Sequence, residues 1–390
     1  MEEIKRIAEE IFEEIVNIRR TLHRHPELGF REFKTAELIC QHLEALGIPY
    51  EKNVAQTGVV GLLEVDKNAK TLLMRADMDA LPTREESNCP FKSEIDGQMH
   101  ACGHDAHVSI VLGAATILSR LKDKLQCNVK FVFQPAEEVE GGAEPMIAEG
   151  VMENPKVDAA VGGHVMNSVE AGTIGIKYGE MMACPDDFHM DIHGRGGHGA
   201  YPHNCIDPIA IGVQILTAWN ALSARYTTPV EKHLISTNVF QAGTCFNIIP
   251  DDVHIEGTVR VFNEDLRQQL AKRMKELAEQ IAAAFGATCD FEYVFRYPPL
   301  VNDKSMVDAV RDSAAKIIGA DNVVELTEPS MGGEDFAYFG QLVPSCFINY
   351  GTGNKAQGIT QPLHNSKFTI DEAGIKTGMM VLSQFALDFA

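Results

Sequence analysis

Apolar residues recur at helical spacing near the start of the chain. The pattern over residues 3–22 predicts an amphipathic helix with Ile4, Ile7, Ile11, Ile15, Ile18 and Leu22 on one face. A second helix is expected over 32–46, because Gly47 and Pro49 follow it as helix-ending residues. The segment between them, HRHPELGF (23–30), indicates a turn, and its His23, His25 and Glu27 are given no role.

Short apolar runs then alternate with helical patterns. The runs Thr71–Arg75, Val129–Phe133 and Asp158–Val161 predict buried strands, and this alternation is typical of an α/β fold with a mostly parallel, mixed sheet flanked by helices. Ligands of such sheets lie beyond the carboxyl ends of the strands. Acidic or imidazole side chains follow all three runs: Asp77 and Asp79, then Glu137 and Glu138, then His164.

After Gly179 the pattern changes to strand, helix, strand, strand, helix, strand. This order is typical of a ferredoxin-like α+β unit, so residues 182–295 are expected to form an inserted lid or dimerisation domain. Residues 1–181 and 296–390 would then form the catalytic domain, and a chain of 390 residues is long enough for two domains. The last part predicts a helix over 304–318, a strand over 346–350 followed by a GTG loop, and a helix from Asp371.

The charge of the chain indicates which partners it can bind, and its cysteine content indicates its cellular compartment. The 34 basic and 55 acidic residues give a net charge of −21, which disfavours nucleic acid and anionic membranes as partners. No apolar run is long enough to span a membrane, and the charged start is unlike a signal peptide. Nine cysteines without a repeating frame favour a reducing compartment, so we expect a cytoplasmic protein.

The stretch MHACGHDAH (99–107) holds three imidazoles, a thiol and a carboxylate. Cys102 and His104 are one residue apart, so in a loop both could bind one zinc-like metal. Alone, the stretch is equally consistent with a polar helix start that has Asp105 in its first turn. The residues that the sheet would bring to the same edge are Cys102, His104, Glu138, His164 and His364.

Five ligands suit two metals that share a bridging ligand better than one tetrahedral zinc. Cys102 could bridge, because a metal deprotonates a bound thiol. Glu137, next to a ligand, could take the proton of the attacking water as a general base, so amide hydrolysis is the economical hypothesis. Taken singly, Glu137 and Glu138 are also typical of a solvated helix start, and His164 is also typical of a loop. The occurrence of all these residues together favours the metal site.

Eight motifs in one order carry a resemblance to a known family. They are RADMDALP, HACGHDAH, QPAEE, GGHV, GRGGHGAYPH, FNIIPDDVHIEGTVR, MGGEDFAYF and LHNSKF. In this respect the chain resembles, over almost its whole length, the amidohydrolases related to zinc aminopeptidases and aminoacylases. That group includes hippurate hydrolases, bacterial N-acyl-amino-acid hydrolases, plant auxin-conjugate hydrolases and N-acetyl-diaminopimelate deacetylases.

The resemblance implies hydrolysis of N-acyl amino acids by a centre of two divalent metal ions (Zn, Mn, Co or Ni). It assigns the metals to the five residues named above and the acid/base role to Glu137. It also implies that His198 helps to hold the substrate carbonyl oxygen, commonly in a neighbouring subunit's site, and that Asn247 and Arg260 bind substrate. Arg260 would suit a free carboxylate through a bidentate pair.

Two positions depart from the relatives. Related aminopeptidases have a histidine at the position of Asp77, which suggests that Asp77 and Asp79 orient the ligands and do not bind metal. Gly163 stands where relatives usually carry an aliphatic residue, which changes the packing beside His164.

Other functions stay open at this point. A dipeptidase or aminopeptidase-like hydrolase would use the same scaffold, a thiol hydrolase would use Cys102 as nucleophile and His104 as base, and a metal-storing or peptide-binding protein would not need Glu137. The inserted domain would expose strands unless paired, so a homodimer or homotetramer is expected through it. Hinges near residues 181 and 296 would allow the domains to close.

Overall fold

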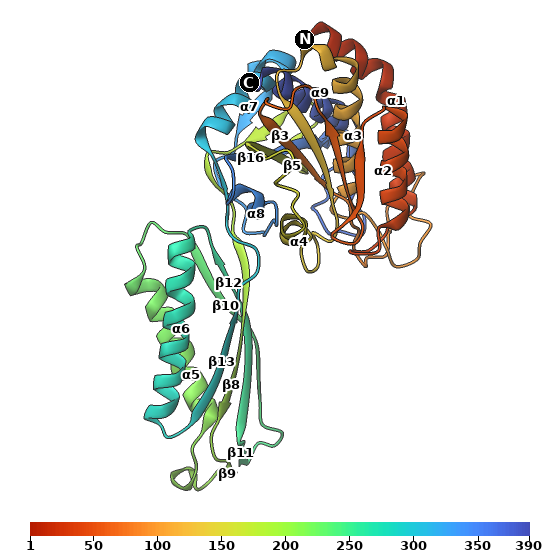
Figure 1. Cartoon of the computed structure of the whole chain (residues 1–390). Helices are drawn as coiled ribbons and strands as arrows, with labels where there is room; N and C mark the ends of the chain where they lie inside the picture. Colours follow the sequence, from red (N-terminus) through yellow and green to blue (C-terminus); the bar gives the residue numbers. More distant parts are fainter. The chain divides into compact units, whose positions relative to one another are not determined.

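An eight-stranded mixed sheet forms the centre of the first of two units in the computed structural model, which describes residues 1–390 (Figure 1). This unit comprises Met1–Met181, Val301–Glu328 and Asp335–Ala390. The strands, in spatial order, are β1 (Tyr50–Val54), β2 (Gly58–Leu63), β4 (Asn128–Gln134), β3 (Thr71–Asp77), β5 (Ala159–Glu170), β16 (Ser345–Gly353), β6 (Ile174–Ile176) and β15 (Val323–Glu325).

The centre of this sheet is parallel. The adjacent pairs β4–β3, β3–β5, β5–β16 and β6–β15 are parallel, whereas the pairs β1–β2, β2–β4 and β16–β6 are antiparallel. Strands β3 and β4 are buried along their whole length, as continuous apolar runs in parallel sheets require. The mixed, mostly parallel sheet that the sequence predicts is therefore confirmed.

Helices cover both faces of the sheet. On one face α2 (Phe33–Ala45), α3 (His104–Arg120), α7 (Lys304–Ile318) and α9 (Ala373–Asp388) pack against the strands, and α1 (Glu2–Arg24) lies on α3 and α9. Thus α1 and α9, from opposite ends of the chain, lie side by side (Figure 1). The short helices α4 (Ala143–Ala148) and α8 (Ala337–Gly340) contact each other, and α8 contacts β16. Phe336, just before α8, packs on Phe347 of β16, which by the strand's alternation points away from the α9 side.

Two glycine-containing segments were expected to be loops and are strand. Strand β5 continues through Gly162, Gly163 and His164, and β16 includes the Gly351–Gly353 segment. Glycine has a low strand propensity, so the sequence pattern placed these ends too early. A Cβ atom at Gly163 would lie 2.7 Å from Cζ of Tyr350 and 2.8 Å from the carbonyl oxygen of Ile348, which explains why an aliphatic side chain is absent there.

The second unit comprises Met182–Leu300 and Pro329–Glu334. This unit also includes residues 296–300 and 329–334, although both segments were expected in the catalytic domain. Its four antiparallel strands lie in the order β10 (His233–Ala242), β12 (Asp252–Val261), β8 (Cys184–His193) and β13 (Thr288–Val294). Helices α5 (Pro208–Tyr226) and α6 (Glu264–Ala284) pack against each other and on this sheet, which gives the expected ferredoxin-like arrangement.

Local sequence explains where these two helices begin. Asp207 and Asn263 accept hydrogen bonds from backbone N–H groups of the first turn of α5 and α6, and Pro208 occupies the first position of α5. Trp219 of α5 is buried against Phe188 of β8, with ring centroids 5.0 Å apart. Short strands β9 (Gly197–His198) and β11 (Ile248–Ile249) pair with each other, as do β7 (Gly179–Met182) and β14 (Leu300–Asn302).

None of the helices is both long enough and apolar enough to cross a lipid bilayer.

Candidate metal centre

The start of α3 positions the first two candidate ligands. Gly103, between Cys102 and His104, has φ +90°, and a Cβ atom there would lie 2.4 Å from Cγ2 of Val165. Only glycine tolerates both the left-handed backbone and this contact. The loop therefore lies directly against β5, next to His164.

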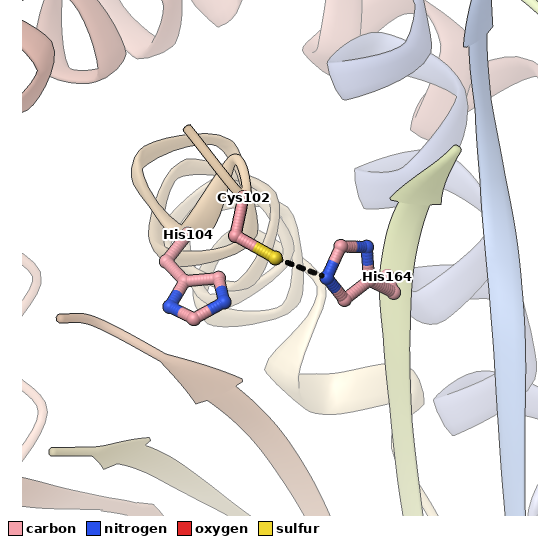
Figure 2. A group of neighbouring side chains, drawn as sticks. All are labelled: Cys102, His104 and His164. Atoms are coloured by element: carbon pink, nitrogen blue, oxygen red, sulfur yellow. Dashed lines mark hydrogen bonds between the residues drawn. The ribbon is translucent and has the colours of Figure 1, made fainter. Parts of the chain in front are cut away.

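The Cys102 thiol lies between two imidazoles. Its Sγ atom lies 3.1 Å from Nε2 of His164, and Figure 2 shows the sulfur pointing at that ring. On another side, Nε2 of His364 lies 3.3 Å from the same sulfur. His364 is held by its backbone N–H, which donates to the carbonyl of Ala101 over 2.9 Å. Three segments that are distant in sequence thus meet at one buried sulfur atom.

Hydrogen bonds fix the ring orientation of two histidines. Nδ1 of His104 donates to Oδ1 of Asp79 over 3.1 Å, and Nδ1 of His164 donates to the carbonyl of Val165 over 2.7 Å. In both rings Nε2 is therefore the nitrogen that remains for a metal, which binds imidazole in its neutral form. Asp79 therefore fixes the ring of a candidate ligand, which is the role that the resemblance to related aminopeptidases suggests for it.

The loop after β4 carries Glu137 and Glu138. The backbone N–H of Glu138 donates to Oδ2 of Asp79 over 3.0 Å, so Asp79 holds this loop as well as His104. Oε1 of Glu138 lies 3.3 Å from Nε2 of His364 and 3.8 Å from Nε2 of His104. Glu137 is 8% exposed, and its carboxylate lies within 4.8 Å of the ligand atoms of His104 and Glu138.

The structure brings all five candidate ligands together. Within two groups, the ligand atoms lie within 4.8 Å of one another: Cys102 with His104 and His164, and Cys102 with Glu138 and His364. Nε2 of His104 is buried without a hydrogen-bond partner. Such an orphaned atom is costly in a folded protein unless something else satisfies it. The donor set of one sulfur, three nitrogens and one carboxylate fits a divalent transition metal.

The charge balance of the site favours a cation. Burial alone would disfavour a charged His104, but Asp77, Asp79 and Glu138 outweigh it and raise the pKa of His104 to about 10. Burial, followed by the charges of Glu138 and Glu137, raises the pKa of the Cys102 thiol well above its usual value. The surroundings are therefore negative, and a thiolate forms there only with a compensating positive charge.

A buried network behind the ligands was missed by sequence reasoning. Nδ1 of His107 lies 2.5 Å from Oδ1 of Asp77, and its Nε2 accepts the backbone N–H of Val165, the residue after His164. Arg75 donates to Asp77 and to Asp335, each over 2.7 Å. Asp77 thus lies in a buried hydrogen-bond network, where it links His107 to Arg75. The only signal in the sequence was that His107 and Asp335 belong to the HACGHDAH and MGGEDF motifs.

The three expected substrate-binding residues belong to the second unit. Nδ1 of His198 accepts the N–H of Ala200 over 3.1 Å, and the side chain is exposed. The backbone carbonyl of Asn247 accepts the N–H of Gly199 over 2.8 Å, beside His198. Arg260, in β12, donates to the carbonyl of Val259 over 3.1 Å. His198 and Asn247 thus lie on adjoining segments of one surface of this unit.

The chain is similar to known hydrolases over most of its length. The chain is 40% identical to thermostable carboxypeptidase 2 of Saccharolobus solfataricus, with 100% of this chain and 99% of the relative covered. It is 43% identical to an N-acyl-L-amino acid amidohydrolase of Geobacillus stearothermophilus, with 77% and 81% covered. The solved structure of Bacillus subtilis YxeP, described as a dinuclear metal-binding peptidase, matches with a TM-score of 0.85 at 34% identity, covering 97% of this chain and 98% of that one.

The model of peptidase family M20/M25/M40 matches residues 73–388, a range that includes all five candidate ligands and Glu137. The family model matches most of the chain, and relatives that are 40% and 43% identical match 100% and 77% of it; together these matches establish the relationship. The chain therefore belongs to peptidase family M20/M25/M40 and is a hydrolase.

Proposed function

We propose that this protein hydrolyses the amide bond of N-acyl amino acids with two divalent cations and Glu137 as acid/base. The observation that carries the proposal is Nε2 of His104, which is buried without a hydrogen-bond partner and lies 3.8 Å from Oε1 of Glu138 in a negatively charged site. The name of the Geobacillus relative, an N-acyl-L-amino acid amidohydrolase, supports the substrate class.

The two groups of ligand atoms support two cation positions. One cation, Zn, Mn, Co or Ni, would be held by His104 and His164, the other by Glu138 and His364, and Cys102 belongs to both groups and would bridge them. When bound, such cations polarise a substrate carbonyl and lower the pKa of a water molecule. The YxeP structure, described as dinuclear, supports the number of cations.

Glu137 is the acid/base in this proposal. Glu137 is not a member of the two groups of ligand atoms that contain Cys102. Its carboxylate nevertheless lies within 4.8 Å of the ligand atoms of Glu138 and His104. It takes a proton from the attacking water and passes it to the nitrogen of the leaving amine. Asp79 orients the ligand His104, from which it accepts a hydrogen bond. Asp77 acts indirectly in this proposal: it holds His107, which accepts the backbone N–H of Val165 beside the ligand His164.

The second unit supplies the substrate contacts that we propose. His198 would hold the carbonyl oxygen, commonly in the site of a neighbouring subunit, and Asn247 would bind the substrate beside it. Arg260 would pair with the free carboxylate of the amino acid. These roles rest on the motif resemblance, with the proximity of His198 and Asn247 in support.

A peptidase reaction is the second candidate. The Saccharolobus relative is named a carboxypeptidase, and the metal chemistry does not distinguish an acyl group from an aminoacyl group. A thiol hydrolase with His104 as base is less favoured, because Sγ of Cys102 contacts His164 and His364 rather than His104. Burial also raises the pKa of the thiol well above its usual value, which disfavours the nucleophilic thiolate.

We also propose a homodimer or homotetramer formed through the second unit, in the cytoplasm. Strand β10 is an edge strand, and Leu234 and Phe240 on it are 43% and 38% exposed. Apolar side chains on an open edge favour pairing with another copy. All nine cysteines are free, which supports a reducing compartment.

The test uses the metal-loaded enzyme with panels of N-acetyl amino acids, N-benzoyl amino acids and dipeptides. We expect turnover of at least one N-acyl amino acid, its loss on chelation, and a loss of about 10²-fold or more in Glu137→Gln with bound metal retained. The matched control is Glu140→Gln, an exposed carboxylate in the same loop. Turnover confined to dipeptides would favour the second candidate, and activity that survives chelation would contradict the metal mechanism.

A further inference from the structure

The segment 27–32, which the sequence left without a role, lies between the two loops that carry Asp79 and Glu137. On one side Leu28 forms a parallel bridge with Ala80, whose N–H donates to the carbonyl of Glu27 over 2.8 Å. On the other side Gly29 touches the loop after β4: a Cβ atom at Gly29 would lie 3.1 Å from Cα of Ala136. The segment therefore contacts both loops that build the site.

The side chain of Glu32 binds the second of these loops directly. Glu32 is completely buried, and its Oε1 accepts the backbone N–H of Ala136 over 2.9 Å. Its Oε2 accepts the hydroxyl of Thr57 over 2.5 Å. The carboxyl group thus connects the residue before β2 and the start of α2 to the residue that precedes Glu137.

Ala136 needs such a partner. Its φ is +56°, in the left-handed region that a residue with a Cβ atom rarely occupies. The backbone is held on both sides of Glu137: Glu32 accepts from Ala136, Asp79 accepts from Glu138, and the carbonyl of Ala136 accepts from Gly141 over 2.9 Å. These bonds determine the direction in which Glu137 leaves the backbone, and an acid/base group must be placed within fractions of an ångström.

Glu32 does not serve as a helix cap. It occupies the N-cap position of α2, but its side chain makes no capping hydrogen bond. The N–H groups of Lys34 and Thr35 are capped by the carboxylate of Glu27 instead, each over 2.9 Å. The helix therefore has its own cap, and the Glu32 carboxyl is directed at the loop.

We propose that Glu32 is a positioning residue for Glu137: its carboxyl group holds Ala136 in the left-handed conformation and thereby aims the Glu137 carboxylate. The inference rests on the proposed acid/base role of Glu137. Glu32 does not touch the substrate in this proposal, and it acts only through the backbone of the loop.

The test compares Glu32→Met with the conservative Glu32→Gln, which keeps an acceptor oxygen, and with Glu37→Met, an exposed carboxylate on the same helix. Hydrogen exchange of the peptide covering 134–141 is measured in the metal-loaded enzyme, together with kcat and KM. For Glu32→Met we expect exchange faster by about tenfold or more. We also expect kcat to be lower by roughly tenfold to a hundredfold, with KM little changed. Glu32→Gln should recover most of both values, and Glu37→Met should match the wild type.

The proposal would be overturned if Glu32→Met showed wild-type hydrogen exchange in this peptide or a wild-type kcat. It would also be overturned if Glu32→Gln were impaired as strongly as Glu32→Met in both measurements. Should Glu32→Met not fold, Thr57→Val removes one partner of the same carboxyl, and a smaller change in the same direction is expected. Unchanged exchange and kcat in that variant would also overturn it. If Glu137→Gln keeps full turnover, the proposed function fails, whereas the exchange data still report whether Glu32 holds the loop.

Discussion

The sulfur atom of Cys102 lies 3.3 Å from Nε2 of His364, although 262 positions separate the two residues in the chain. The contact forms because the loop before α3 and the segment after β16 reach the same side of the central sheet. His364 itself has φ +63°, so its backbone is fixed in an unusual conformation by its hydrogen bond to Ala101. This contact is the core of the metal centre proposed here.

Replacement of the shared thiol should affect both cation positions. In Cys102→Ser we expect metal content to fall and kcat to drop by about 10²-fold or more, because a neutral hydroxyl cannot replace a bridging thiolate. Metal analysis and turnover measure this. The control is Cys127→Ser, a buried thiol that bonds to the carbonyl of Ala386 away from the site. Equal metal content in both variants would argue against a ligand role for Cys102.

Asp79 should matter for metal affinity without binding metal. The two carboxylate oxygens of Asp79 accept hydrogen bonds from His104 and from the backbone of Glu138. Asp79→Asn keeps only one of these acceptor oxygens and removes the negative charge beside His104. We expect metal affinity to fall by about 10- to 100-fold, as for other orienting carboxylates. Competition with a chelator of known affinity measures this, and Asp66→Asn, which bonds only to a nearby turn, is the control. An unchanged affinity would mean that the ring orientation is set by other contacts.

Glu32 should make stability depend on pH. Burial raises its pKa from 4.5 to about 7, so the folded protein holds this proton more tightly than the unfolded chain. Its contribution to stability is therefore complete below pH 4.5 and is lost as the pH rises through about 7. In the metal-free protein, Glu32→Gln should gain stability relative to the wild type between these values, by up to about 3 kcal/mol. Urea unfolding at several pH values measures the gap, and a gap that does not change with pH would contradict this account.

Gly163 should not tolerate a side chain. In Gly163→Ala the new Cβ atom would lie 2.7 Å from Tyr350 and 2.8 Å from a carbonyl of β16, so we expect a loss of about 1–3 kcal/mol in unfolding free energy. Gly175→Ala in β6, where the nearest atom would lie 3.1 Å away, is the comparison. Equal stability of the two variants would mean that β5 and β16 move apart without cost.

The sequence predicted most of the regular elements, the five candidate ligands and the orienting role of Asp77 and Asp79, but not the contacts of His107, Asp335 and Glu32 behind them. Periodicity predicts a helix over 264–285, and α6 spans Glu264–Ala284, because a long amphipathic helix repeats its pattern over several turns. It ended β5 too early, because Gly162 and Gly163 weaken a strand pattern that packing around Tyr350 supports. The bond between Glu32 and Ala136 joins residues 104 positions apart, and no local pattern indicates such a pairing.

The most direct test of the account is the number of divalent metal ions per chain in the purified enzyme, followed through stepwise chelation and compared with turnover of an N-acyl amino acid. We expect about two ions per chain and activity that falls with their removal and returns on reloading. Full turnover by protein that holds essentially no transition metal would contradict the proposal that Cys102, His104, Glu138, His164 and His364 form a catalytic metal centre.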